Sequence, residues 1–295
     1  MGNNVPGRKK WLILGAGGQL GREWSKQLER DGCDYLAPAR DRLDITDSGQ
    51  VRRILDEYRP DIVINAAAYT AVDRAEDERK RAEAINSDAP GQLAGICTEM
   101  DTQLIHYSTD YIFPGRLADR KQFPDGYPEM FPAEPVNWYG RTKWLGEEKV
   151  RAAGGTHLIL RVSWLCGAYG NNFVKTMLRL AGEKDQLKVV NDQWGCPSFT
   201  APTVFNTRAL ISRQAYGTFH LTSQGEITWY DFARAVLEIK QIGVDIEPVT
   251  TEEFPTRAGR PAWSKLDIRK LADIPGTRIL PWREELGKLL SRLPA

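Results

Sequence analysis

The chain has 295 residues, with 40 Lys and Arg against 39 Asp and Glu. A chain of this length buries a sizeable hydrophobic core, which excludes a small scaffold held together by disulfides. Its balanced charge predicts no general attraction to nucleic acid or to an anionic membrane surface.

The N-terminal residues 1–10 are polar, and the apolar run 11–14 that follows is too short for a signal peptide or a membrane span. The four cysteines lie far apart without a paired spacing, which indicates reduced thiols rather than a zinc site or a secreted disulfide framework. We therefore expect a cytoplasmic protein with no membrane partner.

Apolar strand patterns alternate with helical patterns through the first half of the chain. Strands are expected near 11–15, 34–37, 61–65 and 103–108, with helices near 48–58 and 79–100 and a glycine-rich turn and helix after the first strand. This alternation predicts an α/β fold with a Rossmann-type, doubly wound parallel sheet.

The second half of the chain begins with a long loop, and its last part departs from the regular alternation of strands and helices. Residues 113–135 are rich in Gly, Pro and charge, and their length is typical of a functional loop. Helical spacing resumes at Tyr139, strands are expected near 157–162, 187–190 and 217–221, and a helix near 229–239. We expect residues 8–165 to form a dinucleotide-binding domain to which 186–214 returns, and 166–185 with 215–295 to form a smaller α/β substrate lobe.

Three glycines, Gly15, Gly18 and Gly21, follow the first strand and open the first helix. Glycine lets the backbone approach a pyrophosphate, and the helix N-terminus supplies unpaired amides and a favourable dipole. A tight turn that only packs helix on strand is the alternative, and the flanking strand and helix favour nucleotide binding.

The second strand ends without the acidic residue that usually binds the adenine ribose hydroxyls. Residues 36–40 end in Arg40, which with Arg42 suits a 2′-phosphate and favours NADPH, with NADH as the alternative. The competing interpretation is that both arginines are solvated loop residues, and it is stronger for Arg42 than for Arg40. The third strand ends in the small residues 66–68, which leave room for a flat cofactor.

Tyr139 and Lys143 are four residues apart in a helical segment and so share one face. A nearby cation stabilises a tyrosinate, and the lowered phenol pKa allows proton exchange with a carbonyl oxygen. A Tyr and Lys at this spacing also occur by chance. Ser108, Thr109 and Asp110 end the fourth strand at the same carboxyl edge as the glycine turn, which strengthens the functional interpretation.

These motifs together resemble the extended short-chain dehydrogenase/reductases and, more narrowly, the dTDP-4-dehydrorhamnose reductase family. The resemblance extends from the first strand to residues 280–282, and its segments are 65–76 (NAAAYTAVDRAE), 108–115 (STDYIFPG), 139–147 (YGRTKWLGE), 171–181 (NNFVKTMLRLA), 190–197 (VNDQWGCP) and 217–221 (GTFHL). It implies reduction by NADPH of the C4 keto group of dTDP-4-dehydro-L-rhamnose to give dTDP-L-rhamnose, in a monomer or homodimer.

The resemblance also implies roles for individual residues. Tyr139 is the expected proton donor, assisted by Lys143 and Thr109. The implied cofactor contacts are Gly15, Gly18, Gln19, Leu20, Gly21, Arg40, Asp44, Ile45, Ala66, Ala67, Ala68, Tyr139 and Lys143. The implied substrate contacts are Thr70, Thr109, Asp110, Tyr111, Trp164, Asn172, Gln193 and Arg260, of which the last three are assigned to the nucleotide or pyrophosphate.

The chain departs from the family pattern in two places. Residues 116–124 look like an insertion in the loop, and Phe131 replaces the acid of a Glu-x-Asp pair that begins at Glu129. Some members dimerise around magnesium held by glutamates; Glu23 matches one of these, but the second is absent from 198–202, so we predict no metal.

Two other functions stay open at this stage. One is a sister reductase acting on a different nucleotide-linked 4-keto-6-deoxy sugar, which the insertion favours. The other is a cofactor-binding regulatory subunit of the same fold, against which Tyr139, Lys143 and Thr109 argue.

Overall fold

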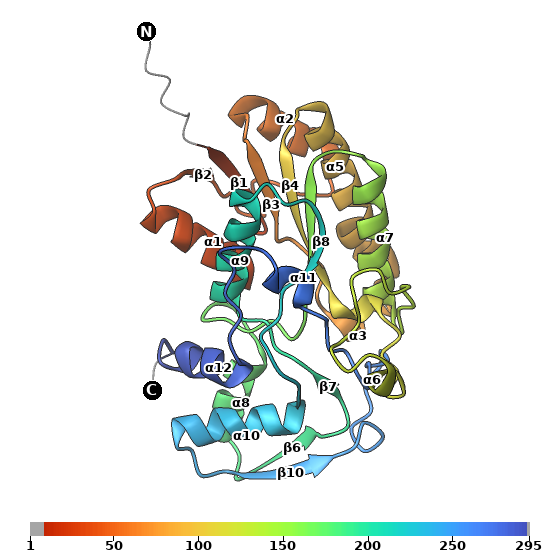
Figure 1. Ribbon diagram of the computed structural model, residues 1–295, viewed down its shortest axis with the longest axis vertical. Helices are drawn as coiled ribbons and strands as arrows, with labels where there is room; N and C mark the ends of the chain where they lie inside the picture. The colour runs from red at the N-terminus through yellow and green to blue at the C-terminus, as the bar shows by residue number, and fades with distance from the viewer. Residues whose placement is uncertain (1–8, 294–295) are drawn as a thin grey trace.

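A computed structural model describes residues 9–293, and its centre is a parallel sheet of six strands (Figure 1). The strand order is β2-β1-β3-β4-β5-β8, and every neighbouring pair is parallel. The strands are β1 (Lys10–Leu14), β2 (Asp34–Leu36), β3 (Ile62–Asn65), β4 (Gln103–Thr109), β5 (His157–Val162) and β8 (Gly217–His220). The chain runs outward from β1 to β2 and returns to β3 on the other side of β1. In such sheets, ligands bind outside the carboxyl ends of the strands where the order reverses.

Helices cover both faces of this sheet, as the alternation of side chains along each strand requires. Ile13 faces a core formed with α1 (Gln19–Arg30) and α9 (Thr200–Ser212), whereas Leu12 and Leu14 face a core formed with α2 (Ser48–Tyr58), α5 (Ala89–Glu99) and α7 (Trp138–Ala152). Figure 1 shows α1 and α9 on one side of the strands and α5 and α7 on the other. The predicted Rossmann-type architecture is confirmed.

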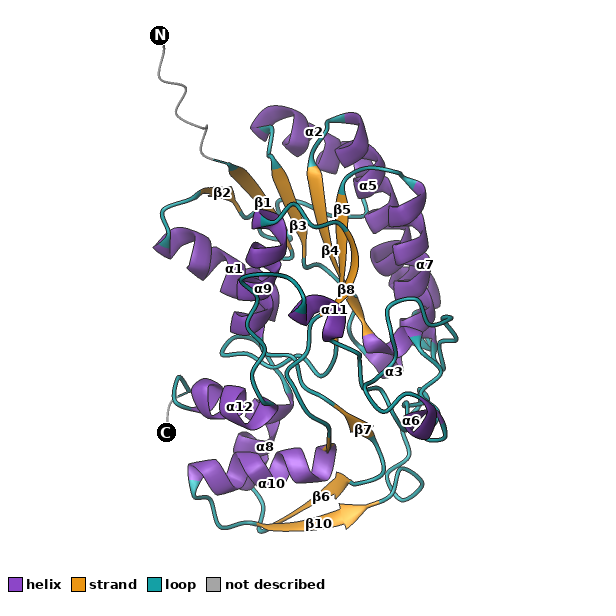
Figure 2. Cartoon of the chain, in the orientation of Figure 1, coloured by secondary structure: helices purple, strands orange, loops and turns teal. Residues whose placement is uncertain are grey.

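Below the sheet, the last part of the chain builds a smaller unit (Figure 2). Strands β6 (Gln186–Val190) and β10 (Asp245–Val249) pair in parallel, and α8 (Phe173–Ala181), α10 (Trp229–Lys240) and α12 (Trp282–Leu290) share its core. The two-residue strands β7 (Trp194–Gly195) and β9 (Ile227–Thr228) form an antiparallel pair nearby.

The strand pairing differs from the expected domain boundaries at two strands. We expected 186–214 to return to the large sheet, but only α9 does so, because β6 pairs with β10. Conversely, β8 was expected in the smaller lobe and pairs with β5. The reason is burial: alternate residues of β6, Leu187 and Val189, enter the small core, whereas Phe219 of β8 packs into the large one.

The long helix expected at 79–100 is interrupted. It consists of α4 (Arg79–Glu83), a π-helical turn η1 (Ala84–Asp88) and α5. Two shorter helices, α3 (Val72–Ala75) and α11 (Arg269–Ala272), lie in the connections that follow β3 and precede α12. Within residues 9–293, no helix is both long enough and apolar enough to cross a membrane.

Candidate active site

The glycine turn brings three parts of the backbone into close contact. Gly15 has φ +81°, and a Cβ there would lie 2.5 Å from the amide nitrogen of Ala67, so only glycine lets the turn touch the end of β3. A Cβ on Gly21 would overlap the carbonyl of Gly15, so this glycine lets α1 pack onto the turn. Gly18 caps α1 without a side-chain hydrogen bond, which leaves the first amides of the helix available to an anion.

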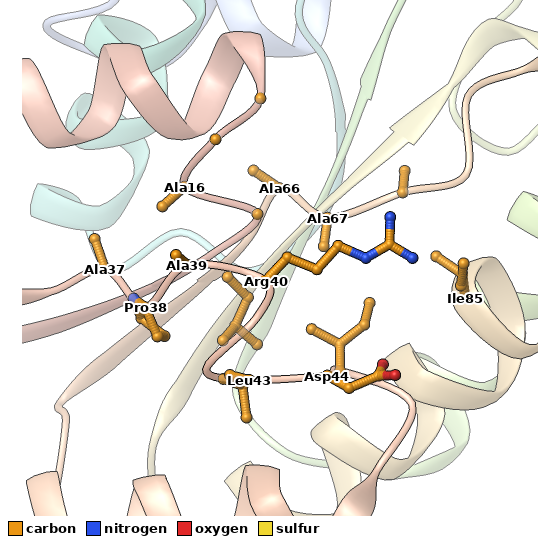
Figure 3. Close-up of a pocket in the computed structure, with 16 residues that line it drawn as sticks. Ala16, Ala37, Pro38, Ala39, Arg40, Leu43, Asp44, Ala66, Ala67 and Ile85 are labelled. Atoms are coloured by element: carbon orange, nitrogen blue, oxygen red, sulfur yellow. The ribbon is translucent and has the colours of Figure 1, made fainter.

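A cavity of about 520 Å³ opens beside this turn, at the carboxyl ends of β1, β2 and β3 (Figure 3). Its volume lies in the usual range of small-molecule sites. Of the expected cofactor contacts, those that line it are Gly15, Gly18, Arg40, Asp44, Ile45, Ala66, Ala67 and Ala68. The lining also includes residues that the sequence analysis did not single out, namely Leu14, Ala16, Gly17, Ala37, Pro38, Ala39, Leu43 and Ile85. Most of these adjoin a predicted contact in the sequence, whereas nothing in the sequence indicated Ile85.

Three expected cofactor residues next to the turn lie outside this lining. Leu20 and Gly21 are buried, and Leu20 packs into the core between α1 and the sheet. Gln19 turns away from the pocket, and its amide nitrogen donates to the carbonyl of Leu165, just after β5, at 3.3 Å. The helical period explains the difference, because successive residues at the start of α1 point in different directions.

Arg40 is exposed, and its side chain extends across the pocket past Ala67 toward Ile85 (Figure 3). Asp44 accepts hydrogen bonds from the backbone and hydroxyl of Thr46, and these bonds lower the pKa of its carboxyl. The pocket therefore combines apolar walls, unpaired helix amides and one extended guanidinium. This donor set fits a dinucleotide that carries an additional phosphate.

The second group of expected site residues meets one strand further along the sheet. β4 ends at Thr109, and η2 (Asp110–Ile112) follows it. The side chain of Asn137 caps α7 through the amide of Gly140, and a Cβ on Gly140 would overlap the carbonyl of Tyr111. This close approach places the first turn of α7 on η2, where the rings of Tyr111 and Tyr139 meet edge to face at 5.7 Å.

Burial, rather than mutual attraction, dominates the pKa values of the Tyr139 and Lys143 pair. It raises the pKa of Tyr139 to about 12, and the Thr109 hydroxyl acts in the opposite direction. It also lowers the pKa of Lys143 to about 8, with partial compensation from Glu147. The expectation that Lys143 lowers the phenol pKa is wrong for this arrangement, because Lys143 Nζ donates to the carbonyl of Tyr107 at 2.6 Å.

The expected sugar and nucleotide contacts are spread over several loops. Thr70 is exposed on the segment between β3 and α3. Trp164, just after β5, has φ +47° and stacks on Trp229 of α10 with ring centroids 3.6 Å apart. A positive φ is unfavourable for a large side chain, and the stacking helps to hold it. Gly195 makes room for the indole, because a Cβ there would lie 2.8 Å from Trp164 Cζ2.

The three residues assigned to the nucleotide or pyrophosphate bond to protein groups in this structure. Asn172 Nδ2 donates to Gln19 Oε1 at 3.0 Å and to the carbonyl of Gly167 at 2.8 Å. Gln193 Nε2 donates to the hydroxyl of Thr251 at 3.0 Å. Arg260 is paired with Asp73 at 2.8 Å, and its side chain is 15% exposed. A nucleotide would therefore have to share or replace these bonds.

The loop with the expected insertion is held against the smaller unit. Residues 116–124 contain α6 (Asp119–Gln122), whose Arg120 pairs with Glu226 at 2.6 Å and stacks over the ring of Trp194 at 4.1 Å. Glu226 also accepts from Trp263 Nε1 at 2.7 Å. The loop thus connects the β4 side of the large sheet to the strand pair β7 and β9.

Comparisons with known proteins converge on one family. Residues 9–294 match the family model described as the RmlD substrate binding domain. The chain is 39% identical to the spore coat polysaccharide biosynthesis protein SpsK of Bacillus subtilis, over 95% of this chain and 96% of that protein. It is 38% identical to dTDP-4-dehydrorhamnose reductase of Burkholderia thailandensis, over 94% of this chain and 97% of that protein. The crystal structure of dTDP-4-dehydrorhamnose reductase from Bacillus anthracis in complex with NADP superposes with a TM-score of 0.91 at 36% identity, covering 96% of this chain and 99% of that one.

Proposed function

This chain belongs to the RmlD substrate-binding domain family, and from this we propose that it is an NADPH-dependent reductase of dTDP-4-dehydro-L-rhamnose that gives dTDP-L-rhamnose. One observation carries the proposal. The cavity between the glycine turn, Arg40 and Ala66–Ala68 opens at the same sheet edge where Thr109, Tyr139 and Lys143 converge. A reductase needs a dinucleotide pocket and a proton donor side by side at this edge.

The residues divide the work between binding and proton transfer. The amides of α1 would hold the pyrophosphate, Arg40 would receive the 2′-phosphate, and the small side chains of Ala66–Ala68 would leave room for the flat cofactor. The bound cofactor supplies the hydride. Tyr139 donates its phenolic proton to the C4 oxygen as the alcohol forms, and the Thr109 hydroxyl orients that oxygen. Lys143 remains largely protonated near neutral pH, because its pKa is about 8, and we assign it to the nicotinamide ribose of the cofactor.

We extend the proposal to the organisation of the chain. The six-stranded sheet and its helices bind the dinucleotide, and the unit around β6, β10, α8 and α10 binds the nucleotide sugar, with Trp164 between them. The reduced state of Cys33, Cys97, Cys166 and Cys196 fits an enzyme that works with NADPH in the cytoplasm.

The experiment that tests this function measures NADPH oxidation with dTDP-4-dehydro-L-rhamnose and with other nucleotide-linked 4-keto-6-deoxy sugars, followed by identification of the product by NMR. We expect dTDP-L-rhamnose as the product. A different sugar as the preferred substrate would favour the sister reductase. Cofactor binding without oxidation, whatever sugar is offered, would favour the regulatory subunit and contradict the proposal.

Tyr139→Phe provides the matched variant. The ring keeps its edge contact with Tyr111, but the transferable proton is lost. We expect turnover to fall on the order of 10²- to 10⁴-fold, the usual contribution of general acid catalysis, with an unchanged Kd for NADPH measured by fluorescence titration. Near-normal turnover in this variant would remove Tyr139 from the proton-donor role.

A further inference from the structure

Asp110 places a buried carboxyl group beside the reacting centre. Its side chain is 4% exposed at the start of η2. Oδ2 accepts from the hydroxyl of Ser163 at 2.8 Å, and Oδ1 accepts from the hydroxyl of Thr109 at 3.0 Å. Within residues 9–293, no Lys, Arg or His side chain hydrogen-bonds to it or forms an ion pair with it. Because burying an uncompensated carboxylate is costly, this environment favours the protonated acid.

The hydroxyl of Thr109 connects this carboxyl group to the phenol of Tyr139. The Thr109 side chain hydrogen-bonds Asp110, and its interaction with Tyr139 lowers the pKa of the phenol. The amide of Tyr111 donates to the same oxygen at 3.2 Å and fixes its position. Lys143 donates to the Tyr107 carbonyl, whereas Thr109 contacts both the phenol of Tyr139 and the carboxyl group of Asp110.

Burial, and not a neighbouring charge, favours the protonated form of Asp110. Burial raises the pKa of its carboxyl, and the hydroxyl groups around it only partly offset that effect. The titratable neighbours are Tyr111 on its own element and Tyr139 on α7, and both are neutral near pH 7 because burial raises the pKa of each phenol. Beyond Tyr111, the charges of Arg260 and Asp73 pair with each other.

We propose that Asp110 is a positioning residue that stores the proton with which Tyr139 is recharged, delivered through the Thr109 hydroxyl. After Tyr139 has given its proton to the C4 oxygen, Thr109 Oγ1 passes its own proton to the tyrosinate. Thr109 Oγ1 takes the carboxylic acid proton of Asp110 in exchange. The Asp110 carboxylate then recovers one proton from solvent, so each turnover consumes one solvent proton and no electrons move along the path. The inference rests on the proposed function, because that function requires Tyr139 to be reprotonated in every cycle.

The first test does not depend on activity. Infrared spectra of the substrate-free protein, recorded as a function of pH, should contain a carboxylic acid C=O band near neutral pH that Asp110→Asn lacks. Ser163→Ala removes a hydrogen bond that stabilises the carboxylate, so the midpoint of that band should move to higher pH. Identical spectra for the wild-type protein and Asp110→Asn near pH 7 would overturn the proposal.

The second test is kinetic and separates a proton store from a structural role. Asp110→Asn should lower kcat about tenfold or more, raise the solvent isotope effect on kcat and flatten the fall of kcat with rising pH, with the Kd for NADPH unchanged. Thr109→Ser, which keeps the hydroxyl, should preserve the wild-type pH profile. A lower kcat with the wild-type pH profile and isotope effect would show a structural role and overturn the proposal. If the wild-type protein reduces no keto sugar, the proposed function fails separately, and the infrared result still decides the protonation state of Asp110.

Discussion

At the scale of single residues, Arg40 shows how one side chain can set the choice of cofactor. It lines the pocket where the second strand ends and a carboxylate for ribose hydroxyls would usually stand. Its guanidinium forms no hydrogen bond or ion pair within the described residues, and its charge is felt by Asp44. An extended, unpaired guanidinium is available to an incoming phosphate without breaking an existing bond.

Arg40→Ala should therefore weaken the binding of NADPH and leave the binding of NADH nearly unaffected. A hydrogen bond to a charged group contributes about 1.5–3 kcal/mol, which corresponds to roughly 10- to 100-fold in the Kd for NADPH. Isothermal titration calorimetry with each cofactor measures the ratio of the Kd for NADPH to the Kd for NADH. Arg42→Ala is the matched control, because Arg42 is exposed in the same loop but does not line the pocket. Equal losses for the two cofactors would show that Arg40 does not read the 2′-phosphate.

At the same scale, the sequence predicted Tyr139, Lys143 and Thr109 as candidate catalytic residues, but not that the pKa of Tyr139 is raised. Spacing places Tyr139 and Lys143 on one helix face, which the structure confirms. The pKa values depend on how deeply α7 is buried and on which acceptor the ammonium reaches, here the carbonyl of Tyr107. Neither property is local in the sequence, so neither was predictable from the motif.

At the scale of elements, α7 is positioned by contacts that require glycine. A Cβ on Gly146 would overlap the carbonyl of Asn86 in the π-turn η1, so α7 and η1 pack with almost no space between them. Asn86 Nδ2 in turn donates to Thr142 of α7 at 3.1 Å and to the carbonyl of Tyr69 at 3.0 Å. The helix that carries Tyr139 and Lys143 is thus held in place by backbone contact as well as by its apolar face.

Gly146→Ala should accordingly destabilise the protein by about 1–3 kcal/mol, the usual cost of overpacking a buried contact. Gly95→Ala in α5 is the control, because a Cβ there meets nothing within 4 Å. Replacing a mid-helix glycine at an open position should stabilise by about 0.5–1 kcal/mol. Urea unfolding of both variants measures the two changes, and a stable Gly146→Ala variant would show that α7 can move away from η1.

The sequence pattern predicted the six strands of the large sheet, strand β6 and the helices α1, α2, α5, α7 and α10. It did not predict α8, α9, α12, β10 or the π-turn, nor which sheet β6 and β8 join. Periodicity in 79–100 indicates one helix, whereas the structure has the turn η1, whose Asn86 accepts a hydrogen bond from the amide of Tyr69 in a distant loop. β6 and β8 are both short apolar runs, and which sheet each joins depends on the core that receives its side chains. Such contacts between segments far apart in the chain leave no local pattern.

At the scale of the whole molecule, a buried charge network joins α7 to the sheet. Glu147 is fully buried, and burial would raise its pKa, but Arg161 of β5 at 2.7 Å and Arg151 hold the pKa of that carboxyl below its usual value. Arg161 also contacts His220 of β8 at 3.2 Å. The network fixes the helix that bears Lys143 against strands β5 and β8.

A hydrogen bond between the start of α1 and the start of α8 joins the large sheet to the smaller unit. Gln19 is the first residue of α1, and Asn172 is the N-cap of α8, where its Oδ1 accepts from the amide of Lys175 at 3.2 Å. Through Nδ2 the same side chain donates to Gln19 Oε1 at 3.0 Å. A cofactor bound beside the start of α1 could therefore influence, through Gln19 and Asn172, the unit proposed to bind the nucleotide sugar.

Asn172→Ser separates the two roles of this residue. Serine caps a helix about as well as asparagine, so the cap is kept, but the Nδ2 bonds to Gln19 and to the Gly167 carbonyl are both lost. We expect the coupling between NADPH and dTDP binding, measured by calorimetric titration of each ligand with and without the other, to fall by about fivefold, the lower end of typical coupling. Thermodynamic linkage requires that NADPH changes the affinity for dTDP by the same factor as dTDP changes the affinity for NADPH, which gives an internal check. Gln19→Ala removes the same bond from the other side, so the double variant should lose no more coupling than either single one. Additive losses would mean that Asn172 acts on the nucleotide itself, as the family resemblance first suggested, and not through the glycine turn.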